Sequence, residues 1–412
     1  MSRPLLRLDD YGPIIGAAAV AEIRELAHRL HGRRVLMVNS TAVGGGVAEL
    51  LTRLVPLLRD LAIPTRWEVI QGDKEFFGVT KAIHNALHGA PVTLTPAMRD
   101  LFREVGVQNA AALDLDADLV IIHDPQPLPL VERRVSARGH WVWRCHVDAS
   151  HPQPAVWEFL RKYIVQYDAS VFSAPEFSQD LPMPQYMIHP AIDPLAEKNR
   201  EMTDADVEAV LADLGIRDDR PIVTQVSRFD RLKDPIGVIR AYQMVRRTAE
   251  CQLVLAGGGA SDDPEGAAVL KEVRQAADGD PQIHVLDLPP KSDREINALQ
   301  RASAVVVQKS LREGFGLTVT EALWKKRPVV ASAVGGIPLQ VLHNLTGLLV
   351  HSVEGTAYRI RTLLRDPAFA RRLGENGHEY VKTRFLTTSN LRRWLALAHA
   401  LGHPGERIIR LP

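Results

Sequence analysis

Cysteine is scarce in this sequence of 412 residues, with only Cys145 and Cys251 present. Two cysteines cannot form the dense disulfide framework of a small secreted domain, and their scarcity indicates a reducing, cytoplasmic compartment. Long hydrophobic runs are also missing, because no stretch of roughly 18 or more apolar residues occurs. The first residues, MSRPLLRLDDYG, lack the apolar core of a secretory signal. We therefore expect a protein without membrane contact.

The sequence also lacks an excess of charge of either sign. Lys and Arg number 50 against 49 Asp and Glu, which gives a formal net charge of +1. This balance argues against a general nucleic-acid-binding protein but is compatible with a local anion pocket. Hydrophobic residues make up 46% and charged residues 24%, which excludes a disordered chain. The length predicts two large domains or three small ones.

Short, β-branched apolar segments alternate along the chain with longer segments of helical periodicity. These segments are residues 34–39, 118–122, 141–146, 169–173, 221–226, 252–256, 283–286, 304–308 and 328–331. Apolar strands separated by helices predict parallel sheets covered on both faces. The pattern restarts after residue 220, so it predicts two doubly wound α/β domains with ligands at the carboxyl ends of the strands.

The boundary between these domains is expected near residue 190, where three prolines occur close together. We expect a first domain over residues 1–192, a second over 193–385, and a C-terminal helix in 386–412 that packs back on the first domain. Thr203 is predicted to cap a helix that ends near Gly215.

Glycines 44, 45 and 46 follow the first predicted strand and open a helix. They let a ligand approach the backbone, and the N–H groups of the helix N-terminus suit phosphate. The segment is neither the dinucleotide fingerprint nor a Walker loop. A tight turn between strand and helix explains Gly45 and Gly46 equally well.

A basic loop, SRFDRLKDP, follows the strand at 221–226. Arg228 and Lys233 could neutralise a diphosphate leaving group there. A solvated loop is the alternative interpretation, because Asp230 and Asp234 could pair with both cations.

Two glutamates flank a glycine-rich turn in EGFGLTVTE, which follows the strand at 304–308. Glu313 precedes the turn and Glu321 lies in the next helix, while Gly314 and Gly316 could offer backbone N–H groups to an anion or a sugar. A pair of glutamates at this spacing is weak evidence alone, and the strand and glycines give it weight.

Two strands of the first domain end in imidazole and carboxylate groups. His123 and Asp124 follow one strand, and His146 and Asp148 follow the next. Such a pair at one strand end is usually structural, whereas two pairs at one edge indicate a functional site. Neither a zinc-binding Cys/His spacing nor a nucleophile elbow occurs.

The spacing of Glu313 and Glu321, together with Arg228 and Lys233, resembles that of the retaining glycosyltransferases of family 4. That resemblance implies the GT-B fold, in which two Rossmann-like α/β domains with parallel sheets face a central cleft. Longer segments are similar to the trehalose glycosyltransferring synthases; they include NSTAVGGGVAELLTRLVPLLRDL, IIHDPQP, WRCHVDAS and QKSLREGFGLTVTEALWKKRPVVAS. Members of that family join a nucleotide-activated glucose to free glucose, reversibly, to give α,α-trehalose.

The resemblance implies roles in donor binding. Arg228 and Lys233 would hold the diphosphate, approached by the backbone of Gly45 and Gly46. Glu313 would bind hydroxyls of the donor glucose, and Glu321 the ribose. The remaining donor contacts would come from Gly314, Phe315, Gly316 and Leu317, with the base beside residues 288–291.

The resemblance also implies an acceptor side. His146 would lie beside the transferring sugar and Asp124 would contact the sugars, which makes them catalytic candidates together with Glu313, Arg228 and Lys233. His123 and Asp148 are further acceptor-binding candidates. Asp73, Lys74 and Glu75 are weaker ones, for which a solvated loop is an equally good interpretation.

Several alternatives stay open at this point. A retaining trehalose phosphorylase, another GT-B sugar-nucleotide glycosyltransferase, an epimerase or a non-catalytic sugar-nucleotide sensor would share the fold. The sequence offers no protein cage for a metal, although Mg²⁺ could assist through the donor diphosphate. An exposed apolar helix face could form a homodimer. The base of the nucleotide, the direction of the reaction and the acceptor contacts are not defined.

Overall fold

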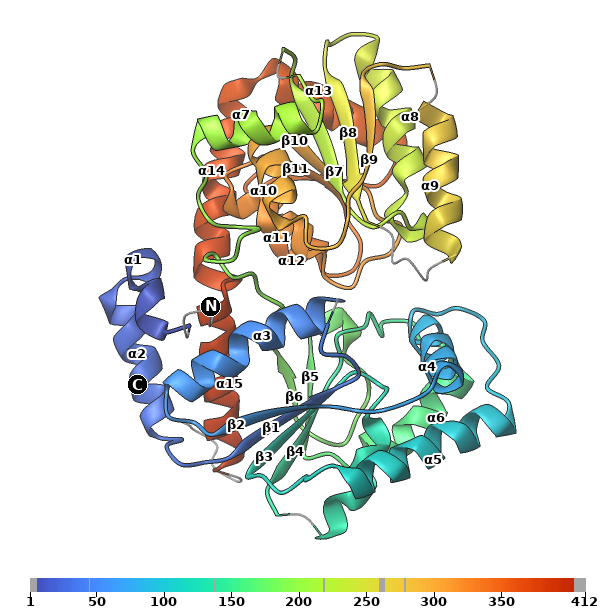
Figure 1. Cartoon of the computed structure of the whole chain (residues 1–412), viewed down its shortest axis with the longest axis vertical. Helices are drawn as coiled ribbons and strands as arrows, with labels where there is room; N and C mark the ends of the chain where they lie inside the picture. The colour runs from blue at the N-terminus through green and yellow to red at the C-terminus, as the bar shows by residue number, and fades with distance from the viewer. Residues whose placement is uncertain are drawn as a thin grey trace. The chain divides into compact units, whose positions relative to one another are not determined.

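A computed structural model describes residues 6–43, 45–136, 138–217, 219–258, 264–277 and 279–403. The chain divides into two compact units, which we call the first and second domains (Figure 1). The first domain comprises Met1–Pro190 together with Thr387–Pro412, and the second comprises Ala191–Leu386. The chain therefore enters the second domain once and returns to the first for its last helix.

The first domain contains a six-stranded sheet in which every neighbouring pair of strands is parallel. The strand order is β2-β1-β3-β4-β5-β6. The strands are β1 (Val35–Asn39), β2 (Thr65–Val69), β3 (Leu119–His123), β4 (His140–Arg144), β5 (Ala169–Phe172) and β6 (Gln185–Met187). The residues of β1 and β3 are all buried, as expected for a parallel sheet covered on both faces.

Helices cover both faces of this sheet. They are α1 (Gly12–Ile15), α2 (Ala17–His28), α3 (Gly45–Asp60), α4 (Lys74–Leu87), α5 (Pro96–Ala112), α6 (Pro154–Ile164) and α15 (Thr387–Leu401). On one face, α15 packs against α2 and α3, as Figure 1 shows, and its Leu391 and Trp394 share a core cluster with Met37 and Val142. Helix α4 contacts both α5 and α6.

The second domain contains another parallel six-stranded sheet, with the order β12-β11-β10-β7-β8-β9. The strands are β7 (Ile222–Val226), β8 (Gln252–Gly257), β9 (Ile283–Asp287), β10 (Ser303–Gln308), β11 (Val329–Ser332) and β12 (Leu348–Val350). The helices are α7 (Asp204–Asp213), α8 (Pro235–Arg246), α9 (Pro264–Ala277), α10 (Asp293–Ala302), α11 (Leu317–Trp324), α12 (Ile337–Gln340), α13 (Val353–Arg365) and α14 (Pro367–Arg384). Thr203 caps α7 as predicted, by accepting from the backbone N–H of Asp206.

Two features of the sheets differ from the sequence-based expectation. The predicted strand at residues 141–146 ends at Arg144, so His146 lies in the following loop. Strands β2, β6 and β12 were not expected. Each lies at the edge of its sheet, and each includes partly exposed positions. Edge strands need no continuous apolar run, which explains why the apolar pattern misses β2 and β6; β12 is apolar but only three residues long.

Candidate functional site

The candidate residues of each domain gather beyond the carboxyl ends of its strands. In the first domain they follow β1, β2, β3 and β4, and in the second they follow β7 and β10. Ligands of doubly wound domains bind at this edge, where successive loops bring distant residues together. We call the candidates of the first domain the first half-site and those of the second domain the second half-site.

Two imidazoles and a carboxylate form the centre of the first half-site. His123 Nδ1 lies 3.0 Å from His146 Nε2, and the two rings stack with their centroids 5.3 Å apart. Asp124 Oδ1 accepts from the backbone N–H of His146 at 2.7 Å. Asp124 has a φ of +66°, a left-handed conformation that is uncommon for a non-glycine residue. His123 is buried, whereas Asp124 and His146 are partly exposed, so these two can meet a ligand.

Burial shifts the pKa values of all three groups. It lowers the pKa of His123 to about 3, with a further contribution from the charge of Arg144. The pKa of His146 falls well below its usual value because of burial first, then Arg144 and His123. Burial raises the pKa of Asp124 to about 6, against the opposing effects of the His146 N–H and Arg144. Both imidazoles are therefore neutral at physiological pH, and each can donate and accept one hydrogen bond.

Arg144 is a member of this half-site that the sequence analysis did not include. It is the last residue of β4 and only 1% exposed, and its Nη2 donates to Ser173 Oγ at 3.0 Å. Burial lowers its pKa to about 10, and the Asp124 carboxylate partly opposes that effect. A charged residue inside the apolar segment WVWRC is the sequence signal that could have identified it.

The other first-domain candidates lie on neighbouring loops. Gly45 and Gly46 are the first two residues of α3, as predicted, and Gly44 lies outside the described residues. Asp73 is the N-cap of α4 and accepts from the Phe76 N–H at 2.8 Å, and Lys74 and Glu75 follow it on the exposed first turn. Asp148 Oδ1 accepts from the backbone and the hydroxyl of Ser150. Among the described residues, no hydrogen bond or ion pair joins the Asp73 loop to the two imidazoles.

In the second half-site, Lys233 and Glu313 form a close ion pair. Lys233 Nζ lies 2.7 Å from Glu313 Oε2, with only 19% and 9% of the two side chains exposed. The same oxygen accepts from Ser310 Oγ at 3.0 Å and from Gln308 Nε2 at 3.3 Å. Gln308 and Ser310, which the sequence analysis did not single out, thus hold the carboxylate in one orientation. The arrangement places one cation and one fixed carboxylate together at the end of β10.

Arg228 has a different setting from Lys233. Its side chain is 67% exposed and lies 3.5 Å from Asp230 Oδ2, so it can turn toward a ligand at little cost. Asp234 caps α8 and pairs with the buried Lys309 rather than with Lys233. The alternative interpretation is a solvated loop in which Asp230 and Asp234 pair with the cations. It does not hold for Lys233, which pairs with Glu313 instead.

Hydrogen bonds from residues that follow β11 hold the glycine-rich turn after Glu313 in place. Gly316 has a φ of +83° and is the N-cap of α11, which begins at Leu317. The backbone N–H of Gly336 donates to Gly314 O at 3.1 Å, and Gln340 Nε2 donates to Phe315 O. Gly335 also has a positive φ, and a Cβ on it would lie 1.6 Å from Glu313 O. The loop after β11 thus holds the turn that carries Glu313.

Glu321 lies in α11 and is only 3% exposed. Its Oε1 lies 3.7 Å from Lys198 Nζ, and its Oε2 lies 3.5 Å from Gln300 Nε2. Four residues later, at the C-cap of α11, Lys325 Nζ donates to Gln300 Oε1, Asn199 Oδ1 and the Glu321 carbonyl. Burial lowers the pKa of Lys325 to about 7. These contacts tie the helix with Glu321 to the segment that enters the second domain.

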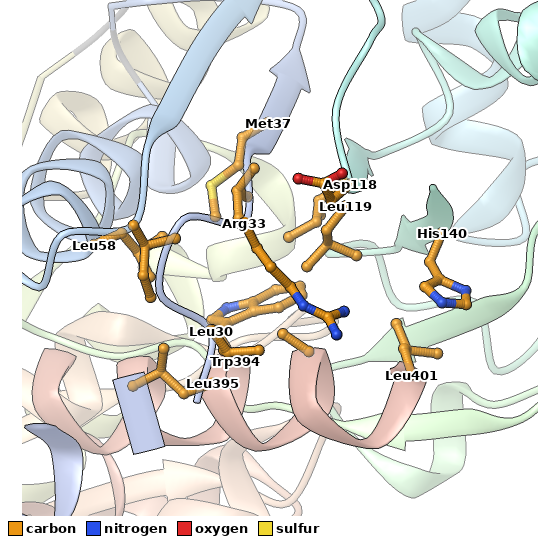
Figure 2. Close-up of a pocket in the computed structure, with 14 residues that line it drawn as sticks. Leu30, Arg33, Met37, Leu58, Asp118, Leu119, His140, Trp394, Leu395 and Leu401 are labelled. Carbon is orange, nitrogen blue, oxygen red and sulfur yellow. The ribbon is translucent and has the colours of Figure 1, made fainter. Parts of the chain in front are cut away.

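An apolar cavity in the first domain lies away from these candidates. It adjoins the first residues of β1, β3 and β4 and has a volume of about 30 Å³. Figure 2 shows Trp394, Leu395 and Leu401 of α15 lining it, with Arg33, Asp118 and His140 as its polar neighbours. This volume is far below the several hundred Å³ of a typical ligand pocket, so the cavity cannot hold a sugar.

The described residues contain neither a cluster of metal-ligating side chains nor a helix long and apolar enough to cross a membrane. Cys145 and Cys251 are both buried and unpaired. The polar groups of the two half-sites are imidazole, carboxylate, ammonium, guanidinium, amide, hydroxyl and backbone groups.

Comparison with known proteins defines the class. Residues 206–380 match the family described as glycosyl transferases group 1. The α,α-trehalose-phosphate synthase (UDP-forming) from Burkholderia xenovorans, solved with glucose-6-phosphate, has the same fold, with a TM-score of 0.69 and 13% identity over 89% of this chain and 100% of that chain. The protein is a glycosyltransferase with the GT-B fold.

The first half of the chain narrows this class further. Residues 37–179 match the family described as trehalose synthase, N-terminal domain. The trehalose synthase of Thermococcus litoralis is 44% identical over 96% of this chain and 97% of its own length. That of Rubrobacter xylanophilus is 45% identical over 95% and 96%. The chain belongs to the trehalose synthase family, as the sequence resemblance predicted.

Proposed function

We propose that the protein transfers glucose from a nucleoside-diphosphate glucose to free glucose, with retention of configuration, giving α,α-trehalose in a reversible reaction. The observation that carries this proposal is the contact between Lys233 and Glu313 at the end of β10. The cation matches a phosphate oxygen, and the fixed carboxylate matches a sugar hydroxyl. A nucleoside-diphosphate glucose carries both groups in one molecule and can satisfy the pair.

The donor is proposed to bind mainly to the second domain. Arg228 and Lys233 stabilise the negative charge that grows on the diphosphate. In the first domain, the N-terminal turn of α3 with Gly45 and Gly46 offers backbone N–H groups that suit a phosphate. Glu321, held by Lys198 and Gln300, accepts from the ribose hydroxyls. Mg²⁺ is not required in this scheme, because side chains of the protein neutralise the diphosphate.

The acceptor is proposed to bind beside His146 and Asp124. Neither Asp124, engaged by the His146 N–H, nor Asp148, engaged by Ser150, has the setting of a nucleophile. We therefore propose front-face attack. The C1–O bond to the diphosphate breaks with its electron pair on the diphosphate oxygen, and the acceptor oxygen bonds to C1 on the same face. Its proton passes to the departing phosphate oxygen.

A release assay tests this function. Purified protein is incubated with UDP-, ADP- or GDP-glucose, with and without glucose, and the free nucleoside diphosphate is measured. We expect release that depends on glucose, and a chelator should leave most of it. Release without glucose, or conversion of the donor alone, would favour a hydrolase or an epimerase. Glucose 1-phosphate formed from trehalose and phosphate, with no nucleotide-dependent reaction, would identify a phosphorylase.

A further inference from the structure

A buried guanidinium lies beside a buried imidazole on one face of the first sheet. Arg144 at the end of β4 and His123 at the end of β3 are partners in register, so their side chains point to the same face. Trp394 of α15 covers this face, with its ring centroid 6.4 Å from that of His123. Arg144 and His123 are each 1% exposed, so water does not screen the charge between them.

Each of these two side chains carries a polar atom without a partner. Among the described residues, neither Arg144 Nη1 nor His123 Nε2 has a hydrogen-bond partner, and both atoms are buried. A guanidinium has only donors and keeps its charge inside a protein. The charge of Arg144 acts on His123 and favours a lone pair on its Nε2, whereas an N–H there would be a buried donor without an acceptor.

Because the two imidazoles are in contact, an unprotonated Nε2 on His123 also determines where His146 carries its proton. His123 Nδ1 and His146 Nε2 are 3.0 Å apart, so one nitrogen must donate and the other accept. Both rings are neutral, because burial and the Arg144 charge lower both pKa values. If His123 keeps its lone pair on Nε2, its proton is on Nδ1 and is donated to His146. His146 then carries its own proton on Nδ1.

We propose that Arg144 is a positioning residue that selects the Nδ1–H tautomer of His123, so that His146 accepts at Nε2 and presents Nδ1–H to a sugar hydroxyl. The hydrogen bond made by one ring nitrogen fixes the proton on the other. The final step rests on the proposed function, in which His146 contacts the transferring sugar. The tautomers themselves belong to the resting protein and can be observed without any reaction.

A buried acceptor on α15, the helix that covers this face, would favour the opposite arrangement if His123 Nε2 reached it. Among the described residues, Asn390 Oδ1 on α15 is a buried acceptor without a partner, while its Nδ2 donates to His189 O at 2.7 Å. Asn390 lies one turn before Trp394 on the same helix. If His123 Nε2–H donated to this oxygen, both tautomers would be reversed. The opposite outcome of the test is therefore that both rings are protonated at Nε2.

Nitrogen NMR distinguishes the two outcomes directly. The full-length protein is labelled with ¹⁵N-histidine, and a long-range ¹H–¹⁵N correlation spectrum is assigned through His123→Gln and His146→Gln. We expect both rings to show a protonated Nδ1 and an unprotonated Nε2. A protonated Nε2 on either ring would overturn the proposal. This measurement on the unmodified protein needs no folded variant of Arg144.

Two substitutions of Arg144 test the cause. Arg144→Met removes the charge at similar volume, and Arg144→Lys keeps it. We expect Arg144→Met to change the tautomers and lower kcat about tenfold, the effect of losing one hydrogen bond, with KM within about twofold. Arg144→Lys should keep the wild-type tautomers. Unchanged tautomers in a folded Arg144→Met protein would refute the role of Arg144. Correct tautomers without transfer from any donor would refute only the proposed function.

Discussion

At the scale of single residues, the contact between Lys233 and Glu313 explains most about the donor side. The two side chains are nearly buried, and Gln308 and Ser310 orient the carboxylate. A carboxylate held by fixed partners needs no reorganisation when a sugar hydroxyl approaches, and a cation already in place responds at once to charge on a diphosphate. The pair is therefore organised for charge that develops during the reaction.

Removing the cation should mainly affect the chemical step. We expect Lys233→Ala to lower kcat by about 100- to 1000-fold, the effect of removing one preorganised group that stabilises developing charge. Arg231→Ala is a matched control on the same turn, because Arg231 pairs with Glu272 in an exposed position. It should change kcat by less than about twofold. Equal losses in the two variants, measured by steady-state kinetics, would show that the turn matters only as structure.

Asp124 should destabilise the fold at neutral pH. Its pKa is raised to about 6 by burial, so the protonated form is favoured in the folded state. Stability is therefore complete below the unfolded pKa near 4 and falls as the pH rises through 6. Because Asp124 is partly exposed and solvent screens its charge, its ionisation lowers the free energy of unfolding at pH 7.5 by about 1–2 kcal/mol.

The substitution Asp124→Asn tests this cost. The amide oxygen can still accept from the His146 N–H, and asparagine adopts the positive φ of this position readily. We expect Asp124→Asn to raise the midpoint of urea unfolding at pH 7.5, to have little effect at pH 4, and to lower activity. A variant that is less stable than wild type at pH 7.5 would contradict the assigned pKa. Full turnover would remove Asp124 from the mechanism.

At the scale of elements, the apolar pattern predicted the interior strands and missed three edge strands. Interior strands such as β3 and β7 are buried on both faces and must be apolar. Edge strands such as β6 are short and partly exposed, so nothing in the local sequence marks them. Strand ends also located the half-sites, since parallel strands bring their carboxyl ends to one edge.

Residues that act through another side chain could not be predicted in the same way. Gln308, Ser310 and Lys198 are ordinary polar residues until the fold brings them to Glu313 or Glu321. Arg144 is the exception, because a charged residue within a buried strand is unusual. The apolar pattern thus predicts that the candidate residues lie at the carboxyl ends of the strands. The contacts that orient these residues depend on tertiary structure.

The loop after β11 should control the position of Glu313. We expect Gly335→Ala to raise the KM for the donor and lower kcat, because the new Cβ would overlap Glu313 O. Gly215→Ala is the control: its φ is also positive, at +70°, but a Cβ there meets nothing within 4 Å. Each variant should lose about 1 kcal/mol from the strained backbone, and Gly335→Ala should lose more because its Cβ would overlap a backbone oxygen. Kinetic defects of equal size in the two variants would contradict the role of this loop.

At the scale of the whole molecule, the last helix belongs to the first domain although 196 residues of the second domain precede it. Helix α15 covers the sheet face that carries His123 and Arg144, and its Trp394 also lines the small apolar cavity in Figure 2. The first domain therefore takes its last helix from the part of the chain that follows the second domain. The sequence analysis expects a helix here that packs back on the first domain, and the tertiary contacts show which residues of that domain it covers.

The central claim is that the protein joins two glucose units through their anomeric carbons with retention. The most direct test is ¹H and ¹³C NMR of the product formed from glucose and each nucleoside-diphosphate glucose in turn. We predict a symmetric disaccharide with a single α anomeric signal and no reducing end, formed in equal amount with the nucleoside diphosphate. A β linkage, a disaccharide with a reducing end, or no disaccharide from any donor would contradict the account.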